Sequence, residues 1–318
     1  MSTESNVEIS VITVTYNSAE CIGTSLNALR EQQGVRAEII VIDNASSDNT
    51  VSVVRSLAGV KLLANRDNVG FGRGCNQGFE ASRGRFLFML NPDACLEQKD
   101  GLTRLCRTME EHPTWGLAGT RILSGDGQSE TGPAMNYPDQ RHARCDFSNL
   151  PGEIAWVLGA SLFLRREVFS AVGGFDPGFF LYGEETDLCL RIRKLGHEIG
   201  FVPEVTVRHI GGVSERGNDP YETRLRSMAG LHRFWMKHYP PDNVLHMIRR
   251  DRFRATLRRE WYALVGRLGG PSSKAWIKHR EYAAISEASR RFLKAHSAGL
   301  GARPESKACA ETNVPGRT

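Results

Sequence analysis

The chain has 318 residues, 40% hydrophobic and 24% charged, with a net charge of +5, which is ordinary for a soluble globular protein with a sizeable core. Its longest apolar stretch, 154–164, is too short for a bilayer span of roughly 20 residues, and its polar N-terminus lacks a signal-peptide layout. The seven cysteines are odd in number and never spaced as CxxC, which argues against a disulfide framework or a zinc site and favours the cytoplasm.

Strands and helices alternate through the first part of the chain. Runs of β-branched and apolar residues predict strands at 8–15, 38–42, 60–63 and 85–90. Helical spacing predicts helices at 19–32, 50–57 and 75–82. This alternation, over about the first 120 residues, predicts an α/β fold with a mostly parallel sheet covered on both faces by helices.

The second part is less regular. Residues 124–151 are polar and read as an excursion or loop. The elements predicted after it are a strand at 154–164, a short helix at 166–172, an amphipathic helix at 184–195, one or two strands at 198–207 and a helix at 220–239. The tail from about residue 299 is polar and is expected to be disordered.

The strand at 85–90 runs into Asn91-Pro92-Asp93. Pro92 cannot continue a central ladder, so an amide and a carboxylate stand at the carboxyl end of a buried strand, where open α/β sheets bind ligands. Asp93 is a hard oxygen ligand that, with a divalent cation, can hold a diphosphate. The alternative is that these residues form only a turn.

Three other polar clusters follow predicted strands and should reach the same edge. They are 15–18, 43–46 and 65–76. A carboxylate such as Asp43 can accept a hydrogen bond from a base or a ribose hydroxyl, and the glycines at 70, 72 and 74 let the backbone approach a ligand closely. Each cluster alone is a weak signal, but their common place after buried strands predicts a shared site.

Two further clusters lie downstream. Glu184, Glu185 and Asp187 gather at a predicted helix start, either as favourable acids at a helix N-terminus or as candidates for a general base. His209 follows a strand and is either an ordinary surface or core histidine or a nitrogen ligand to a metal held by Asp93.

With these motifs in this order, the chain resembles the inverting family-two glycosyltransferases of the GT-A fold, and more narrowly their bacterial rhamnosyltransferase-like branch. The resemblance covers about residues 8–240. It is carried by SVITVTYNS at 10–18, VIDNASSD at 41–48, NVGFG at 68–72, NPD at 91–93, GGFD at 173–176, YGEETDLC at 182–189 and HIGG at 209–212.

The resemblance implies a role for each matching residue. Asp43 would bind a pyrimidine, Asp93 would be the last member of the DXD motif and hold Mg²⁺ or Mn²⁺ with His209, and Glu185 would occupy the catalytic-base position. Trp156, Gly159 and Ala160 would border the donor sugar and the acceptor. The implied nucleotide-sugar pocket consists of Thr15, Tyr16, Asn17, Asp43, Asn44, Ser46, Asn68, Gly70, Phe71, Gly72, Asn76, Asn91 and Asp93.

Two positions depart from the family pattern. Asn91 stands where the DXD motif begins with Asp, a change common in this branch, and removes one negative charge from the diphosphate site. Glu185 stands where the family usually has Asp, so its carboxylate reaches further by one methylene. Glu184, Glu185 and Asp187 therefore all stay open as the base.

The implied reaction is a single displacement with inversion, in which the base takes the proton of an acceptor hydroxyl. The resemblance favours transfer of L-rhamnose from dTDP-rhamnose to a glycan or lipid-linked saccharide of bacterial surface polysaccharide synthesis (cell wall or O-antigen), with a UDP-sugar as the alternative donor. Residues 1–240 would form the transferase domain, with a nucleotide-binding half at 8–122 and an acceptor half at 123–240. A homo-oligomer stays open.

Other functions fit less well. A dinucleotide-binding GxGxxG starting at Gly72 fails because its last position is Gln77, and an HExxH zinc motif starting at His197 fails at Phe201. A non-catalytic nucleotide-sugar-binding protein is harder to exclude, and donor hydrolysis would separate it from an enzyme.

The segment 241–298 is predicted to be a basic helical extension. Between 249 and 294 it has 13 lysines and arginines and four acidic residues, interleaved with large apolar side chains. Such helices can lie on an anionic membrane, here the inner face of the cytoplasmic membrane. The alternatives are a solvated helix face or a dimer contact, and no nucleic-acid-binding module accompanies the charge.

Overall fold

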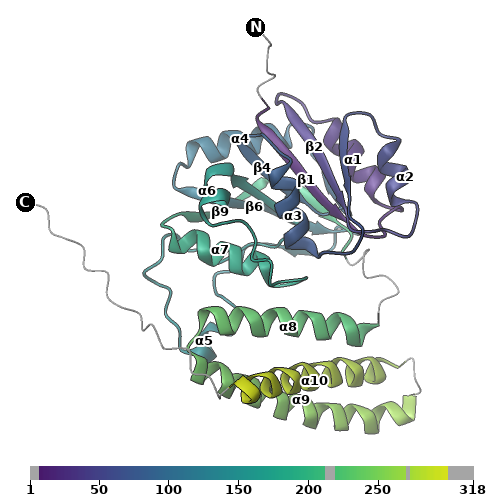
Figure 1. Ribbon diagram of the computed structural model, residues 1–318, viewed down its shortest axis with the longest axis vertical. Coiled ribbons are helices and arrows are strands. Elements are labelled where there is room, and N and C mark those ends of the chain that lie inside the picture. Colours follow the sequence, from purple (N-terminus) through teal and green to yellow (C-terminus); the bar gives the residue numbers. More distant parts are fainter. Residues whose placement is uncertain (1–6, 212–218, 270–272, 300–318) are drawn as a thin grey trace, which may run out of the picture. The chain divides into compact units, whose positions relative to one another are not determined.

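The computed structural model describes residues 7–211, 219–269 and 273–299 (Figure 1). The chain divides into two compact units, Met1–Met247 and Ile248–Thr318. The tail expected to be disordered, apart from Gly299, and Gly212 of the HIGG motif lie outside the described residues.

The first unit is built on one nine-stranded sheet. In spatial order its main strands are β3 (Val60–Ala64), β2 (Ala37–Asp43), β1 (Ile9–Thr15), β4 (Phe86–Leu90), β8 (Ser161–Arg165), β6 (Trp115–Ser124), β9 (Glu198–His209) and β5 (Ala94–Leu96), and β7 (Glu130–Thr131) pairs with β6. The strands from β3 to β4 run parallel, as predicted. Beyond β4 the sheet is mixed, because β8 pairs antiparallel with both β4 and β6, and β5 pairs antiparallel with β9.

Helices cover both faces of this sheet (Figure 1). One apolar core forms under α1 (Ile22–Arg30), α2 (Thr50–Arg55) and α4 (Gly101–Glu111). The other forms under α3 (Phe71–Glu80), α6 (Arg166–Ala171) and α7 (Glu184–Lys194). All residues of β1 and β4 are buried, because these central strands are covered on both sides.

Helix α3 starts earlier than the glycine-rich sequence suggests. A loop was expected up to residue 74, but the helix begins at Phe71. Its glycines are tolerated because they let the helix lie close to β1: a Cβ at Gly74 would be 2.8 Å from Cγ1 of Val14, and one at Gly78 would be 2.4 Å from Cγ2 of Ile12. Close packing against the sheet thus outweighs the low helix propensity of glycine.

The region after β4 differs most from the prediction. Helix α4 and strand β6 were not anticipated, although Leu102, Leu105, Cys106 and Met109 of α4 have helical spacing and are buried. The strand expected at 154–164 is confined to β8, and the residues before it form only an isolated bridge between Trp156 and Ala134. The polar excursion contains β7 and the short helix α5 (Gln140–Ala143).

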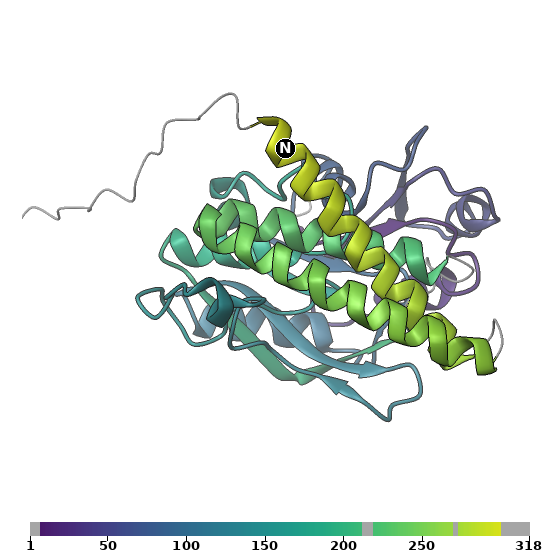
Figure 2. The same cartoon turned by 90° about the horizontal axis from the view of Figure 1, so that it is seen from below.

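Helix α8 (Pro220–His238) completes the first unit, and α9 (Pro241–Gly269) continues from it into the second. In the second unit α9 and α10 (Lys274–Gly299) lie side by side and antiparallel (Figure 2). The rings of Tyr262 and Tyr282 stack at 5.7 Å, and the hydroxyls of Thr256 and Ser286 are 3.1 Å apart. Among the described residues no helix combines the length and the apolar character needed to cross a membrane.

Candidate active site

A cavity of about 510 Å³ opens where β1, β2 and β4 end. Residues that follow these three strands, the segment before α3 and the end of β9 all contribute to its wall, together with the segment before α7 and one turn of α8. The structure thus brings together the polar clusters that were expected to meet at one sheet edge. The predicted site residues that line the cavity are Thr15, Tyr16, Asn44, Asn68, Gly70, Phe71, Asn91, Asp93, Gly159, Ala160, Glu184, Glu185 and His209.

Asp93 and His209 face each other in this cavity. Nε2 of His209 is 3.2 Å from Oδ1 of Asp93 and 3.3 Å from Nδ2 of Asn91. The pairing of β5 with β9 sets this arrangement, since Ala94 lies opposite His209 and the N–H of Ile210 donates to the carbonyl of Asp93 at 3.0 Å. Asp93 is only 5% exposed, so its carboxylate is held on a rigid part of the fold.

The donor set suits a divalent ion that is shared with a substrate. No group of three or more His, Cys, Asp or Glu side chains could hold a metal within the residues that the structure describes. Asp93 and His209 offer one carboxylate and one imidazole. Mg²⁺ is commonly bound by one or two carboxylates plus substrate phosphates, and imidazole and carboxylate are both ordinary ligands of transition metals. The residues therefore fit an ion completed by a diphosphate rather than an all-protein cage.

The loops after β1 and β2 are bound to each other. Both carboxylate oxygens of Asp43 accept hydrogen bonds from Ser46, one from its N–H at 3.0 Å and one from its hydroxyl at 2.5 Å. The N–H of Asn17 donates to the Ser46 hydroxyl at 2.9 Å. None of these three residues lines the cavity, and Asp43 is 1% exposed. Asp43, Ser46 and Asn17 therefore bind the two loops to each other.

The segment before α3 packs closely against the segment before α7. Gly70 has φ of +89°, and a Cβ on it would be 2.3 Å from the carbonyl oxygen of Phe180. The N–H of Phe71 donates to that carbonyl at 3.0 Å, and the Asn68 side chain accepts from the N–H of Gly70 at 3.0 Å. The Asn44 side chain donates to the carbonyl of Gly70 at 3.1 Å. A glycine is required here because both the backbone conformation and the close approach exclude a side chain.

Three predicted site residues have structural contacts and do not line the cavity. The side-chain amide of Asn76 bonds twice to the backbone of Phe175, donating from Nδ2 to the carbonyl and accepting at Oδ1 from the N–H, at 2.9 Å each. Gly72 packs against Phe175, where a Cβ would be 3.0 Å from that of Phe175. The indole N–H of Trp156 donates to the carbonyl of Asn136 at 3.1 Å.

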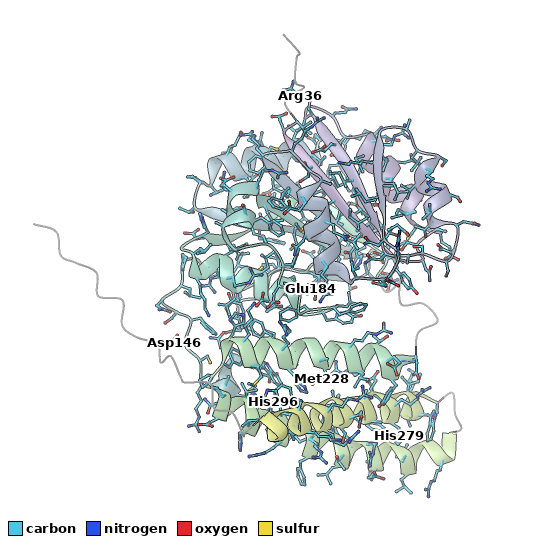
Figure 3. All side chains as sticks on the ribbon, in the orientation of Figure 1. Arg36, Asp146, Glu184, Met228, His279 and His296 are labelled. Atoms are coloured by element: carbon cyan, nitrogen blue, oxygen red, sulfur yellow. The ribbon has the colours of Figure 1, made fainter. Side chains whose placement is uncertain are left out.

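Glu184, labelled in Figure 3, and Glu185 begin α7. Both residues line the cavity. Glu184 is 4% exposed, and its Oε2 has no hydrogen-bond partner among the described residues. Burial, reinforced by the charge of Glu185, raises the pKa of Glu184 well above its ordinary value. Burial also raises the pKa of Glu185, whose Oε2 accepts from the N–H of Gly183 at 3.2 Å. Raised carboxyl pKa values in a cavity suit proton transfer near neutral pH.

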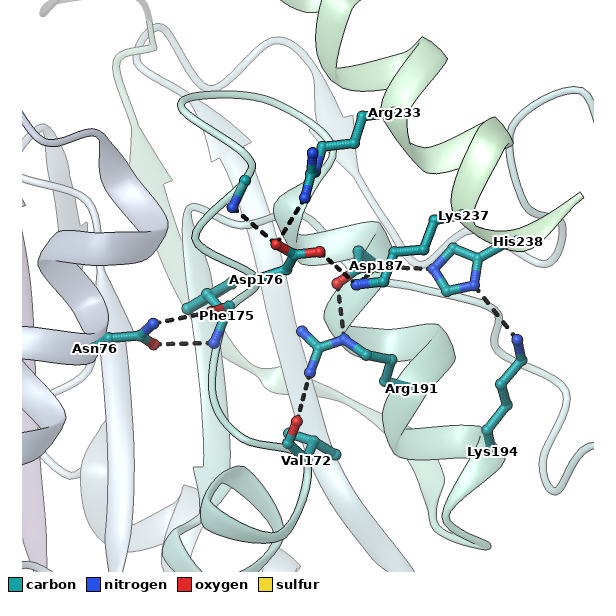
Figure 4. Close-up of polar contacts among 11 residues, drawn as sticks. Asn76, Val172, Phe175, Asp176, Asp187, Arg191, Lys194, Arg233, Lys237 and His238 are labelled. Carbon is teal, nitrogen blue, oxygen red and sulfur yellow. Dashed lines mark hydrogen bonds and ion pairs between the residues drawn. The ribbon is translucent and has the colours of Figure 1, made fainter. Parts of the chain in front are cut away.

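Asp187, the third candidate base, does not line this cavity. Figure 4 shows it among Arg191, Lys237 and His238. It is fully buried, and its carboxylate contacts Arg191 at 2.8 Å, Lys237 at 2.7 Å and His238 at 2.7 Å. Although burial opposes ionisation, the hydrogen bond from His238 and the charge of Arg191 hold the pKa of Asp187 below its ordinary value. Asp187 thus ties α7 to α8.

Several cavity residues were not anticipated from the sequence. Leu158, Phe180, Leu181 and Tyr182 contribute apolar surface, and Arg226 reaches the cavity from α8. The first four lie next to motifs that were recognised. Arg226 is one of many basic residues in the last hundred positions, and no local signal distinguishes it.

The fold and the site define a nucleotide-diphospho-sugar transferase of the GT-A class. The chain belongs to glycosyl transferase family 2, whose model matches residues 10–173. Residues 139–213 also match a model described as the N-terminal domain of galactosyltransferase. The protein is therefore a glycosyltransferase, as the motifs predicted.

Relatives agree with this assignment. The chain is 27% identical over 246 residues to the N-acetylglucosaminyl-diphospho-decaprenol L-rhamnosyltransferase of Mycobacterium tuberculosis, covering 66% of this chain and 78% of that protein. It is 22% identical over 205 residues to the O-antigen chain rhamnosyltransferase WbaN of Salmonella anatum, covering 63% of this chain and 65% of the relative. The mannosyltransferase PcManGT of Pyrobaculum calidifontis, solved with GDP-Man and Mn²⁺, shares the fold with a TM-score of 0.56 at 20% identity, covering 93% of this chain and 81% of that one.

Proposed function

We propose that the protein is a metal-dependent inverting glycosyltransferase that transfers L-rhamnose from dTDP-rhamnose to a hydroxyl group of a saccharide. The observation that carries this proposal is the single cavity that contains both the Asp93–His209 pair and the Glu184–Glu185 pair. A transferase of this kind needs a site for the donor diphosphate and a base for the acceptor hydroxyl in one place. The names of the two bacterial relatives support rhamnose as the sugar.

The donor would bind at the sheet edge. Residues 8–122 would hold the nucleotide, with Thr15, Tyr16, Asn44 and Asn68 at the cavity wall and Asn17, Asp43 and Ser46 supporting the loops behind it. Asp93 and His209 would hold Mg²⁺ or Mn²⁺, and the ion, when bound, would neutralise charge on the departing nucleoside diphosphate. Asn91, a neutral amide, would position the donor.

Glu185 would act as the general base. It lies beside Gly159, where a Cβ would be 3.4 Å from that of Glu185, so its carboxylate borders the part of the cavity assigned to sugar and acceptor. The acceptor oxygen would form a bond to the anomeric carbon while its proton passes to Glu185, and the bond from that carbon to the diphosphate oxygen would break. Attack opposite to the leaving group inverts the configuration. Glu184 is more deeply buried and would remain protonated beside the ionised Glu185.

The acceptor would be a glycan or lipid-linked saccharide of surface polysaccharide synthesis, and residues 123–240 would bind it. The name of the mycobacterial relative, which includes a diphospho-decaprenol, supports a lipid-linked acceptor. Residues 241–298 would then hold the enzyme on an anionic membrane surface. Four large apolar side chains of α9 are exposed at helical spacing and support this: Phe253 (66%), Leu257 (57%), Trp261 (63%) and Leu264 (58%).

The charge around these side chains favours a membrane over a second copy of the chain. Arg249, Arg254 and Arg267 lie on the same helix, and two such basic faces would repel each other, whereas anionic lipid would attract both. The wild type should float together with vesicles that contain phosphatidylglycerol. The double variant Leu257→Ser, Trp261→Ser should remain in the unbound fraction. The control Leu195→Ser, at an exposed apolar residue of α7's C-terminus, should float. Flotation of the double variant would refute this surface.

The function itself is tested with purified protein and a panel of donors. Thermal shift with dTDP-rhamnose, UDP-sugars and GDP-mannose, each with Mg²⁺ or Mn²⁺, identifies the nucleotide. Release of nucleoside diphosphate from the stabilising donor then separates an enzyme from a binding protein. Stabilisation by dTDP-rhamnose with metal-dependent release is the expected result. Binding without any release or transfer would favour a non-catalytic nucleotide-sugar-binding protein. Stabilisation by UDP-sugars alone would show that the donor is a UDP-sugar and not dTDP-rhamnose.

A further inference from the structure

Arg226 reaches the cavity because of how α8 packs. Gly230, one turn further along α8, lies so close to the segment before α7 that a Cβ on it would be 2.0 Å from the carbonyl oxygen of Tyr182. Arg233, on the same face of the helix, pairs with Asp176 at 3.0 Å. These contacts hold one face of α8 against residues 176–182 and bring Arg226 to the cavity wall beside Phe180 and Tyr182.

The guanidinium of Arg226 has no hydrogen-bond or ion-pair partner among the residues that the structure describes. Among the described residues that line the cavity it is the only lysine or arginine. It is half-buried, and within residues 7–211, 219–269 and 273–299 it makes no hydrogen bond or ion pair. Two other cations of the same helix face are both paired, Arg233 with Asp176 and Lys237 with Asp176 and Asp187. A half-buried guanidinium whose donors are unpaired within the described part of the chain is suited to an anionic ligand.

We infer that Arg226 binds a phosphate group of a substrate in this cavity. The inference rests on the proposed function, which brings phosphates there from two sources: the diphosphate of the nucleotide-sugar donor and the diphosphate of a lipid-linked acceptor. The guanidinium fork matches two oxygens of a phosphate at once, and such charge-assisted hydrogen bonds are about twice as strong as neutral ones. Arg226 would therefore position a phosphate from the α8 side of the cavity, independently of Asp93 and His209 on the sheet.

The test compares Arg226→Gln with Arg226→Lys and with Arg224→Gln, which removes an exposed arginine of the same helix. Calorimetry measures binding of dTDP, UDP and GDP with Mn²⁺, and of the corresponding phosphate-free nucleosides. Melting temperatures should be equal in all variants, because Arg226 has no partner to lose among the described residues. Arg226→Gln should weaken the preferred diphosphate by about tenfold or more, with Arg226→Lys between it and the wild type, while nucleoside binding and Arg224→Gln stay unchanged.

Acceptor kinetics distinguish the two sources of phosphate. If Arg226 serves the acceptor, diphosphate binding stays at the wild-type level and KM rises for a diphosphate-linked acceptor but not for a phosphate-free analogue. The inference is overturned if Arg226→Gln changes neither quantity while the wild type binds a nucleoside diphosphate. A wild type that binds no nucleoside diphosphate at all would instead remove the proposed function, and this inference with it.

Discussion

Oδ1 of Asp93 and Nε2 of His209 lie 3.2 Å apart, although the two residues are more than a hundred positions apart in the chain. The antiparallel pairing of β5 with β9 brings them together, because it places Ala94, next to Asp93, opposite His209. His209 of the candidate metal site thus comes from β9, in the mixed half of the sheet. Asp93 lies between β4, in the parallel half, and β5.

Asp93 and Asn91 should contribute unequally to activity. Asp93→Ala removes the carboxylate that faces His209, and we expect transfer to fall by about a hundredfold or more, as for loss of a strong electrostatic contact in a water-excluded site. Asn91→Ala removes only an amide and should cost far less. The ratio of kcat/KM for the two variants, at saturating Mn²⁺, checks this. Equal losses would contradict the division of roles.

Asp187 should matter for folding more than for chemistry. Asp187→Asn leaves Arg191, Lys237 and His238 without their shared anion, and loss of one partner of a buried ion pair costs about 3 kcal/mol. Because the folded-state pKa of Asp187 is depressed, its contribution is present at neutral pH and is lost as pH falls below its ordinary value of 3.8. Urea unfolding at pH 7 measures the loss, with exposed Asp67→Asn as the control. A variant of normal stability but without turnover would place Asp187 in the reaction.

Ionisation of Glu184 should lower the free energy of unfolding of the ligand-free protein as pH rises. Its folded-state pKa is raised, so the folded state holds a proton that the unfolded state releases, and stability falls as pH rises above the ordinary value of 4.5. Glu184→Gln mimics the protonated form and should be more stable than the wild type at pH 8 by about 1 kcal/mol or more, since one pKa unit corresponds to about 1.4 kcal/mol. The two proteins should differ little at pH 4.5. The exposed Glu80→Gln is the control, and a gain that does not depend on pH would rule out this cause.

The parallel half of the fold and the meeting of its loops could be predicted from the sequence, because buried strands such as β1 and β4 are continuous apolar runs that end in polar turns. Asn91 and Asp93 were found in this way. The antiparallel strand β8 was harder to delimit, since the apolar run before it includes residues that form only an isolated bridge, between Trp156 and Ala134. The start of α3 was misplaced because propensity alone disfavours the glycines that close packing against β1 requires.

Contacts between distant parts of the chain distinguish residues that look alike in the sequence. A run of acids at a helix start does not distinguish Glu184, Glu185 and Asp187 from one another. In the structure Asp187 differs because Lys237 and His238 of α8 contact its carboxylate. Asp43 has the position of a ligand-binding carboxylate, and its two oxygens accept local hydrogen bonds from Ser46, three residues along the chain. Nothing near Arg226 in the sequence indicates that Gly230 allows α8 to approach the cavity.

We propose that Glu185 removes the proton of the acceptor hydroxyl. Glu185→Gln keeps the size of the side chain and its place in the cavity but cannot accept that proton. We predict that the kcat for transfer falls by about a hundredfold or more, while calorimetry finds unchanged affinity for the nucleoside diphosphate, since general-base catalysis contributes about 10²–10⁴-fold. Near wild-type turnover in Glu185→Gln would contradict the account.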